Sequence, residues 1–122
     1  MKLFLILGII NGFLAVALGA FGTHGLEGKL SEKALSTWEK AVNYQMFHTM
    51  ALLVVGLLLS RFQAASLSTA GWLFFAGIIL FSGSLYIYAP TGIRMFAMIT
   101  PLGGLAFLAG WIALGYAAIK LV

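Results

Sequence analysis

Four long apolar runs divide the chain, and the short segments between them hold most of its charged residues. About 20 apolar residues, at a helical rise of 1.5 Å, cross a hydrocarbon core roughly 30 Å thick. We therefore predict four membrane-spanning helices: Leu3–Gly22, Ala41–Ser60, Thr69–Ala89 and Pro101–Lys120. The predicted fold class is all-α, an integral-membrane four-helix bundle that forms a single domain over residues 1–122.

Composition agrees with a protein whose solvent is lipid. Hydrophobic residues make up 62% of the chain and charged residues only 8%, whereas a soluble domain has about 25% charged residues. There is no cysteine, which excludes disulfides and thiolate sites. The seven Lys and Arg residues form no basic run, so nothing favours nucleic-acid binding.

The second helix is predicted to begin before its membrane span. The segment "LSEKALSTWEKAV" has apolar residues at helical spacing with charged residues opposite, which predicts an amphipathic extension at the interface and a helix continuous over residues 31–60. Ser31 or Ser36 can cap it, and Trp38 is suited to the headgroup level. For the last span, Thr100 is the predicted cap and Pro101 the first helical residue.

Polar side chains gather in the first half of the second span. Tyr44, Gln45, His48 and Thr49 share one arc of the helix, and Asn43 points nearly opposite. An even number of spans puts the first and third connections on the same side of the membrane, so this arc would form one wall of a cleft open to that side. We expect it to converge on Arg94, on His24 or on the tyrosines of the third span, because polar groups at membrane depth need partners or water. The candidate ligand-binding residues are His24, Tyr44, Gln45, His48, Thr49 and Arg94.

The histidines and the arginine each allow more than one interpretation. His48 fits a hydrogen-bonded structural role or a role in ligand binding or proton transfer. His24 and His48 need not lie at one depth, and the remaining ligands would be interfacial glutamates, so we expect no metal and no cofactor. Arg94 lies in an apolar connection of ten residues between Pro90 and Pro101. It could anchor to headgroups, pair with a glutamate or contact a bound anion.

Small residues recur at spacings of three and four in the first and last spans. Such seams let helix backbones approach closely in lipid. We interpret them mainly as packing surfaces within the chain, with a dimer or larger assembly as the alternative. The predicted packing residues are Gly8, Gly12, Ala15 and Gly19 in the first span and Gly103, Ala106, Gly110 and Ala113 in the last.

Three motifs resemble one known family over nearly the whole chain. "GAFGTHGLEGKL", "WEKAVNYQMFHTMALL" and "FSGSLYIYAPTGIRMFAMITPLGGLAFLAGW" are similar, in order and spacing, to the YgdD/YwdK family of small bacterial membrane proteins. The resemblance implies a four-span protein of the bacterial inner membrane. It implies no molecular function and no catalytic residue.

Two classes of function remain open after these observations. Enzymatic chemistry has few candidate residues, since every carboxylate is expected at the interface and the chain contains neither a Ser–His–acid order nor a phosphate-binding loop. We favour a structural or interaction protein whose partners are membrane lipid, a second copy or another membrane protein. The alternative is a binder or transporter of lipid, small molecules or ions that acts as an oligomer and uses the polar cleft under the first and third connections. Orientation stays open, because four basic residues on one side against three on the other do not decide it.

Overall fold

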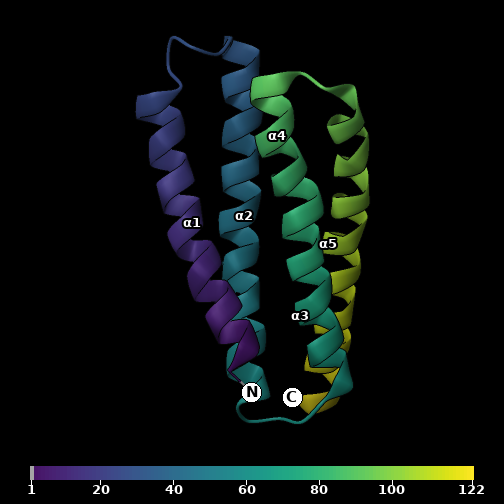
Figure 1. Cartoon of the computed structure of the whole chain (residues 1–122). Coiled ribbons are helices and arrows are strands. Elements are labelled where there is room, and N and C mark those ends of the chain that lie inside the picture. The colour runs from purple at the N-terminus through teal and green to yellow at the C-terminus, as the bar shows by residue number, and fades with distance from the viewer. Residues whose placement is uncertain (1) are drawn as a thin grey trace.

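The computed structural model describes residues 2–122, and all regular secondary structure in that range is helical. The elements are α1 (Leu3–Gly25), α2 (Glu32–Leu59), α3 (Ala65–Gly77), the π-helix η1 (Ile78–Gly83), α4 (Ser84–Thr91) and α5 (Arg94–Leu121). The segments α3, η1 and α4 follow one another without a break and form the third span (Figure 1). Among the described residues, four helices are long and apolar enough to cross a membrane. The predicted all-α membrane fold is confirmed.

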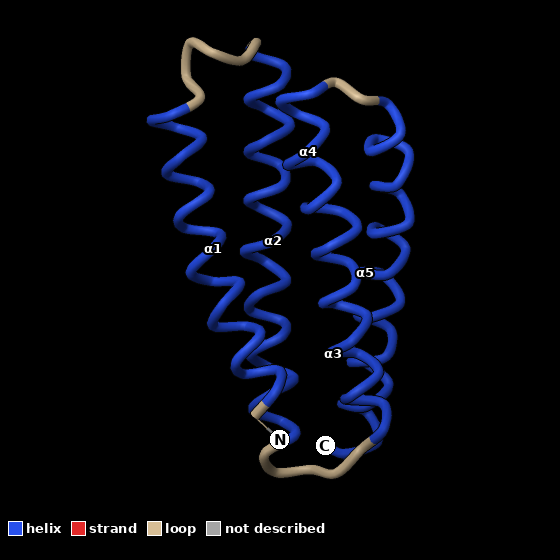
Figure 2. The backbone as a smooth tube through the Cα atoms, viewed as in Figure 1, coloured by secondary structure: helices blue, strands red, loops and turns tan. Residues whose placement is uncertain are grey.

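The connections lie at the two ends of the helices. Figure 2 shows the α1–α2 connection and the α4–α5 connection at one end, and both ends of the described chain with the α2–α3 connection at the other. We call the first of these the connection end. The shared side of the first and third connections is thus as predicted.

The four spans pack mainly in chain order. α1 packs against α2, α2 against the third span, and the third span against α5. The outer spans are accordingly less covered by their neighbours. In the most apolar 18-residue stretch of each span, 22% of the residues are buried in α1 and in α5, against 50% in α2 and 44% in the third span. Both outer helices therefore present broad apolar faces, with Phe13 and Ile112 each about three-quarters exposed.

Helix α2 is continuous, as its pattern predicts. Ser31 is the N-cap, and its side chain accepts a hydrogen bond from the Ala34 N–H at 3.1 Å, which satisfies one of the unpaired donors of the first turn. The alternative cap, Ser36, lies inside the helix. Trp38 is buried, and its indole N–H donates to the Leu18 carbonyl of α1 at 2.9 Å; its position at the headgroup level stays a prediction.

The predicted start of the last helix is wrong. α5 begins at Arg94, and Pro101 lies inside it. Gly92, in the left-handed region at φ 69°, ends α4 in the way glycine commonly does, so the expected ten-residue connection shrinks to two residues. Thr100 caps nothing; its hydroxyl donates to the Phe96 carbonyl of its own helix at 3.2 Å. The proline removes one backbone donor, but in lipid the surrounding residues still satisfy their backbone groups best as a helix.

Small residues of the predicted seams lie where neighbouring helices come closest. A Cβ added to Gly8 would come within 2.7 Å of Leu53, and one added to Gly110 within 2.8 Å of Phe74. At Gly103 it would meet the backbone of Phe81. Gly12 and Gly19 also face α2, Ala15 is fully buried, and Ala106 and Ala113 are partly buried.

The π segment η1 interrupts the third span near its middle. Each turn of a π-helix takes in one residue more than an α-turn, and such segments are frequent at functional sites. Here it adjoins two surface depressions: Phe81 contributes to one and Ser82 to the other. The π segment η1 therefore borders both depressions of the surface.

Candidate functional site

The predicted polar face of α2 divides between two sides of the helix. Gln45 and Thr49 belong to a polar network with α1 and the third span, whereas Tyr44 and His48 face aromatic residues of η1 and α5. The division arises because the third span packs against the middle of α2. One predicted cleft is replaced by two distinct environments.

The first environment is a chain of side-chain hydrogen bonds through three helices. The Gln45 amide donates to Asn11 Oδ1 at 3.0 Å, and the Tyr86 hydroxyl donates to Gln45 Oε1 at 2.7 Å. Asn11 in turn donates to the Leu7 carbonyl at 2.8 Å. Asn11 and Gln45 are buried. We call Asn11, Gln45 and Tyr86 the amide network; it links α1, α2 and α4.

Hydroxyl groups complete the pairing around this network. Thr49 donates to the Gln45 carbonyl at 2.7 Å, and Ser82 donates to the Ala41 carbonyl at 2.7 Å, which joins η1 to α2. Ser84 and Thr100 share a hydrogen bond of 2.6 Å between α4 and α5. Within residues 2–122, no buried side-chain nitrogen or oxygen lacks a partner.

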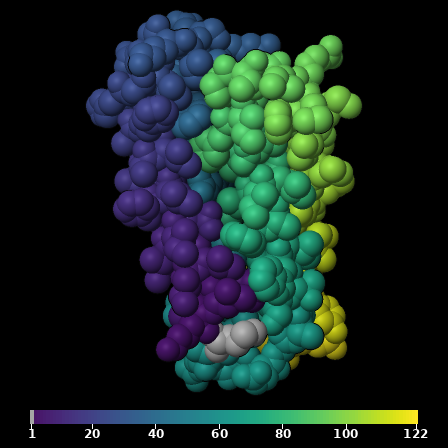
Figure 3. Space-filling view, in the orientation of Figure 1, coloured from purple at the N-terminus to yellow at the C-terminus, as the bar shows by residue number. Residues whose placement is uncertain are grey.

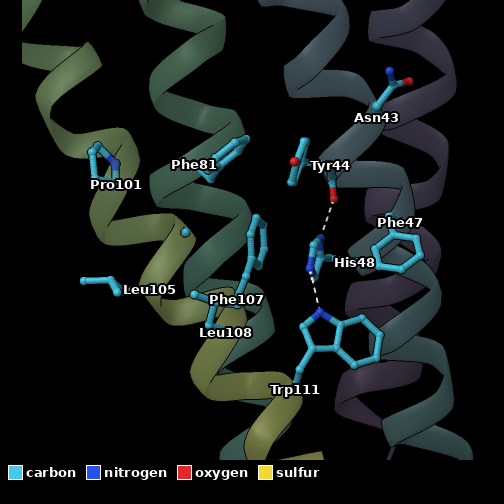
Figure 4. A pocket seen from close by; sticks show the side chains of 11 residues that line it. Asn43, Tyr44, Phe47, His48, Phe81, Pro101, Leu105, Phe107, Leu108 and Trp111 are labelled. Atoms are coloured by element: carbon cyan, nitrogen blue, oxygen red, sulfur yellow. Dashed lines mark hydrogen bonds between the residues drawn. The ribbon is translucent and has the colours of Figure 1, made fainter.

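The second environment surrounds the His48 imidazole. The Trp111 indole N–H lies 3.0 Å from Nε2, and the Tyr44 carbonyl lies 2.8 Å from Nδ1 (Figure 4). An indole nitrogen can only donate and a carbonyl can only accept, so this arrangement requires a neutral imidazole with its proton on Nδ1. The ring also stacks on Phe107, with centroids 3.5 Å apart and planes 8° from parallel.

An aromatic groove opens beside this imidazole, between α2 and α5. Its volume is about 910 Å³. Phe81 of η1 lies at the back, and Pro101, Leu105 and Leu108 of α5 form one wall (Figure 4). The full lining is Asn43, Tyr44, Phe47, His48, Phe81, Pro101, Gly104, Leu105, Phe107, Leu108 and Trp111. The groove offers a ligand apolar contact and little hydrogen bonding.

A smaller furrow lies on the opposite side of η1. It has a volume of about 370 Å³ and runs between α1 and the third span, past Asn11, Gln45 and Tyr86. Figure 3 shows this face, with the purple and blue atoms of α1 beside the green atoms of the third span. The polar atoms along it already bond to one another in the amide network.

Two of the predicted site residues are not part of either environment. His24 and Arg94 are both exposed near the connection end, so the expected convergence of the polar arc on them is wrong. The expected contact with a tyrosine of the third span is confirmed at Tyr86. His48 is buried, at 3% exposure, and its role in binding a ligand stays a prediction.

Sequence reasoning missed three contributors to these sites. Asn11 is the one polar side chain within the predicted first span, which is a usable signal because such residues need partners in lipid. Phe107 and Trp111, four residues apart, share a face of α5 with the lining of the groove. Aromatic residues at that spacing are common in cores, so the pattern alone does not indicate a site.

The donor set gives a metal little to bind. Among residues 2–122 no group of three or more His, Asp or Glu side chains is placed to hold an ion. In addition, the lone pair on Nε2 of His48 is used by the Trp111 N–H. A metal at this nitrogen would require the indole to move away.

These features define a four-span helical membrane protein with a paired polar interior and a lateral apolar groove. Residues 18–104 match a family described as "Protein of unknown function (DUF423)". The chain is 54% identical to the UPF0382 membrane protein YwdK of Bacillus subtilis, over 98% of each chain. It is 53% identical to a UPF0382 membrane protein of Staphylococcus haemolyticus, over 100% of this chain and 99% of the relative. No solved structure matches. The protein belongs to this family of membrane proteins, in agreement with the resemblance of its motifs.

Proposed function

We propose that this protein is a structural or interaction protein of the bacterial cell membrane and has no enzymatic activity. The observation that carries the proposal is the pairing of its interior polar groups with one another. Gln45 uses both its amide nitrogen and its amide oxygen within the chain, and both nitrogens of His48 are engaged. Polar groups that recognise a solute must instead be available to it.

The same pairing argues against a transport path through a single copy. Ion and substrate paths in membranes use charged or polar residues that face a water-filled cavity. The larger groove here is lined chiefly by aromatic and aliphatic side chains, and the one ionisable residue among the buried polar ones, His48, has both ring nitrogens engaged within the chain.

The outer helices provide the surface for an interaction. α1 and α5 are the least covered spans, and their outward residues Phe13 and Ile112 are apolar and strongly exposed. A transmembrane helix of a partner can pack on such a face through close contact.

Photo-crosslinking in intact cells tests this proposal. A photoreactive phenylalanine analogue at Phe13 or at Ile112 should give a discrete adduct with one membrane protein, identified by mass spectrometry. The same analogue at Gln63, which is exposed in the α2–α3 connection, is the control. The partner's assembly should fail in a deletion strain and recover with the wild-type gene. Only lipid adducts at both positions, together with solute uptake by the purified protein in vesicles, would refute the proposal.

A further inference from the structure

We propose that the aromatic groove between α2 and α5 binds one anionic phospholipid. One of its acyl chains would lie in the groove, and its phosphate would lie between Lys40 and Arg94. This goes beyond the proposed interaction role and does not depend on it.

The length of the groove matches one layer of acyl chains. On α5 the lining runs from Pro101 to Trp111, which at 1.5 Å per residue is about 15 Å. This is half of the roughly 30 Å hydrocarbon core. An acyl chain of one leaflet therefore fits the groove along its length, and the lining matches it in polarity.

The two basic residues lie in line with the groove. At 100° per residue, Arg94 falls within about 40° of Pro101 and Leu108 on α5. On α2, Lys40 falls within about 40° of Tyr44. Both cations are exposed, and both lie on the side of the groove that faces the connection end. The two helices thus place positive charge at one end of the aromatic groove.

Their depths suit a lipid phosphate. Counted along each helix from the deep end of the groove, at His48 on α2 and Trp111 on α5, Lys40 lies about 12 Å and Arg94 about 26 Å toward the connection end. These values bracket the roughly 15 Å thickness of one acyl layer. Both side chains are long enough to extend toward the headgroup level from either depth. Asn43, on the rim of the groove, lies between Lys40 and His48 and can donate to an ester carbonyl.

The acidic residues are gathered elsewhere. The chain has three acidic side chains, and Glu27, Glu32 and Glu39 all line a depression beside α1, together with Gly22 and Thr23. None of them lines the groove. Charge at the connection end is therefore divided, with the glutamates at the α1 depression, close in sequence to the exposed Lys29 and Lys33, and with Arg94 at the start of α5. This division favours an anionic lipid over a zwitterionic one.

Native mass spectrometry of the detergent-purified protein tests the proposal. The probes are phosphatidylglycerol and phosphatidylcholine with identical acyl chains, supplied in equal amounts. The wild-type protein should retain one phosphatidylglycerol, with a preference of about 30-fold if each basic residue contributes as basic residues do at an anionic membrane surface. Lys40→Gln with Arg94→Gln should abolish the preference. The matched control, Arg61→Gln with Lys120→Gln, removes the same charge at the opposite end and should keep it.

A second pair of variants tests whether the acyl chain binds in the groove. Gly104 lines the groove, and a Cβ there meets nothing closer than Phe81 at 4.0 Å, so Gly104→Phe should fill the groove without forcing helices apart. It should lose bound lipid of either headgroup. Gly115, on the same helix, has open space around it, so Gly115→Phe is the control and should retain the lipid.

Four outcomes would overturn the proposal. Equal retention of the two lipids by the wild-type protein would remove the anionic preference. Equal losses in the two charge variants would show a nonspecific effect of net charge. Retention of phosphatidylglycerol by Gly104→Phe, or its displacement by inorganic phosphate alone, would show that the groove does not hold the chain.

Discussion

The amide network gives the sharpest test of how this fold is held together. Gln45→Leu keeps the approximate shape of the side chain but removes its bonds to Asn11 and Tyr86. Interhelical hydrogen bonds in membrane proteins contribute on average about 0.6 kcal/mol and at most about 1.7 kcal/mol. Loss of two such bonds should lower the free energy of unfolding by about 1 to 3 kcal/mol.

The full apolar replacement should behave differently from the single change. In Asn11→Leu, Gln45→Leu and Tyr86→Phe combined, no partner is left unpaired, and replacing all partners by apolar groups can be nearly neutral. We expect this triple variant to lie within about 1 kcal/mol of the wild-type protein. The single variant would then be the less stable of the two, although it changes fewer residues.

Reversible unfolding in detergent micelles, followed by tryptophan fluorescence, measures both effects. Gln63→Leu is the matched control, because Gln63 is exposed outside the spans, and it should change stability little. If the triple variant loses as much stability as Gln45→Leu, or more, then packing around these side chains rather than their pairing stabilises the fold, and the reasoning is refuted.

Further predictions concern packing, the imidazole and sidedness. Gly103→Ala should lower stability by about 1 to 3 kcal/mol, because the added methyl would meet the Phe81 backbone; Gly115→Ala should not, and equal effects in a detergent melt would contradict this close packing. Trp111→Phe keeps an aromatic ring but removes the N–H that donates to the imidazole, so it should cost about 0.6 to 1.7 kcal/mol, and an unchanged melting temperature would show that this bond contributes nothing. Single cysteines at Lys29 and Thr91 should react with a membrane-impermeant reagent from the same side of the membrane; labelling from opposite sides would exclude the four-span arrangement.

Hydropathy alone predicts the number and order of the spans, because lipid leaves the backbone few alternatives to a helix. It also predicts which connections share a side of the membrane, although not which side that is. The boundaries at Pro101 were predicted wrongly for a related reason. Proline normally marks a helix start or stop, but Arg94 to Thr100 continue the helix into the interface, and Gly92 provides the actual break. Local signals at glycine and proline were both present, and only the fold decides which of them ends the helix.

Pairing between spans could be predicted only in part. That Gln45 needs a partner follows from its depth, but the prediction kept Arg94, His24 and the tyrosines of the third span as alternatives and did not include Asn11. The division of the polar arc could not be predicted, because it depends on the angular position of the third span relative to α2. Without that angle, Tyr44 and His48 cannot be assigned to α5 rather than to α1.

The π segment η1 has a consequence for the rotational phase of the third span. One residue added to a helix turns everything beyond it by about 100°. Ser84 and Tyr86, which follow η1, bond respectively to Thr100 of α5 and Gln45 of α2, while Phe74, which precedes it, packs against Gly110. Deleting one residue within 78–83 would let the segment revert to α-helical bonding, but it would also rotate Tyr86 away from Gln45 by more than a quarter turn. The π segment η1 thus sets the rotation of α4 about the helix axis relative to α3, so that each of these two segments faces its own partners.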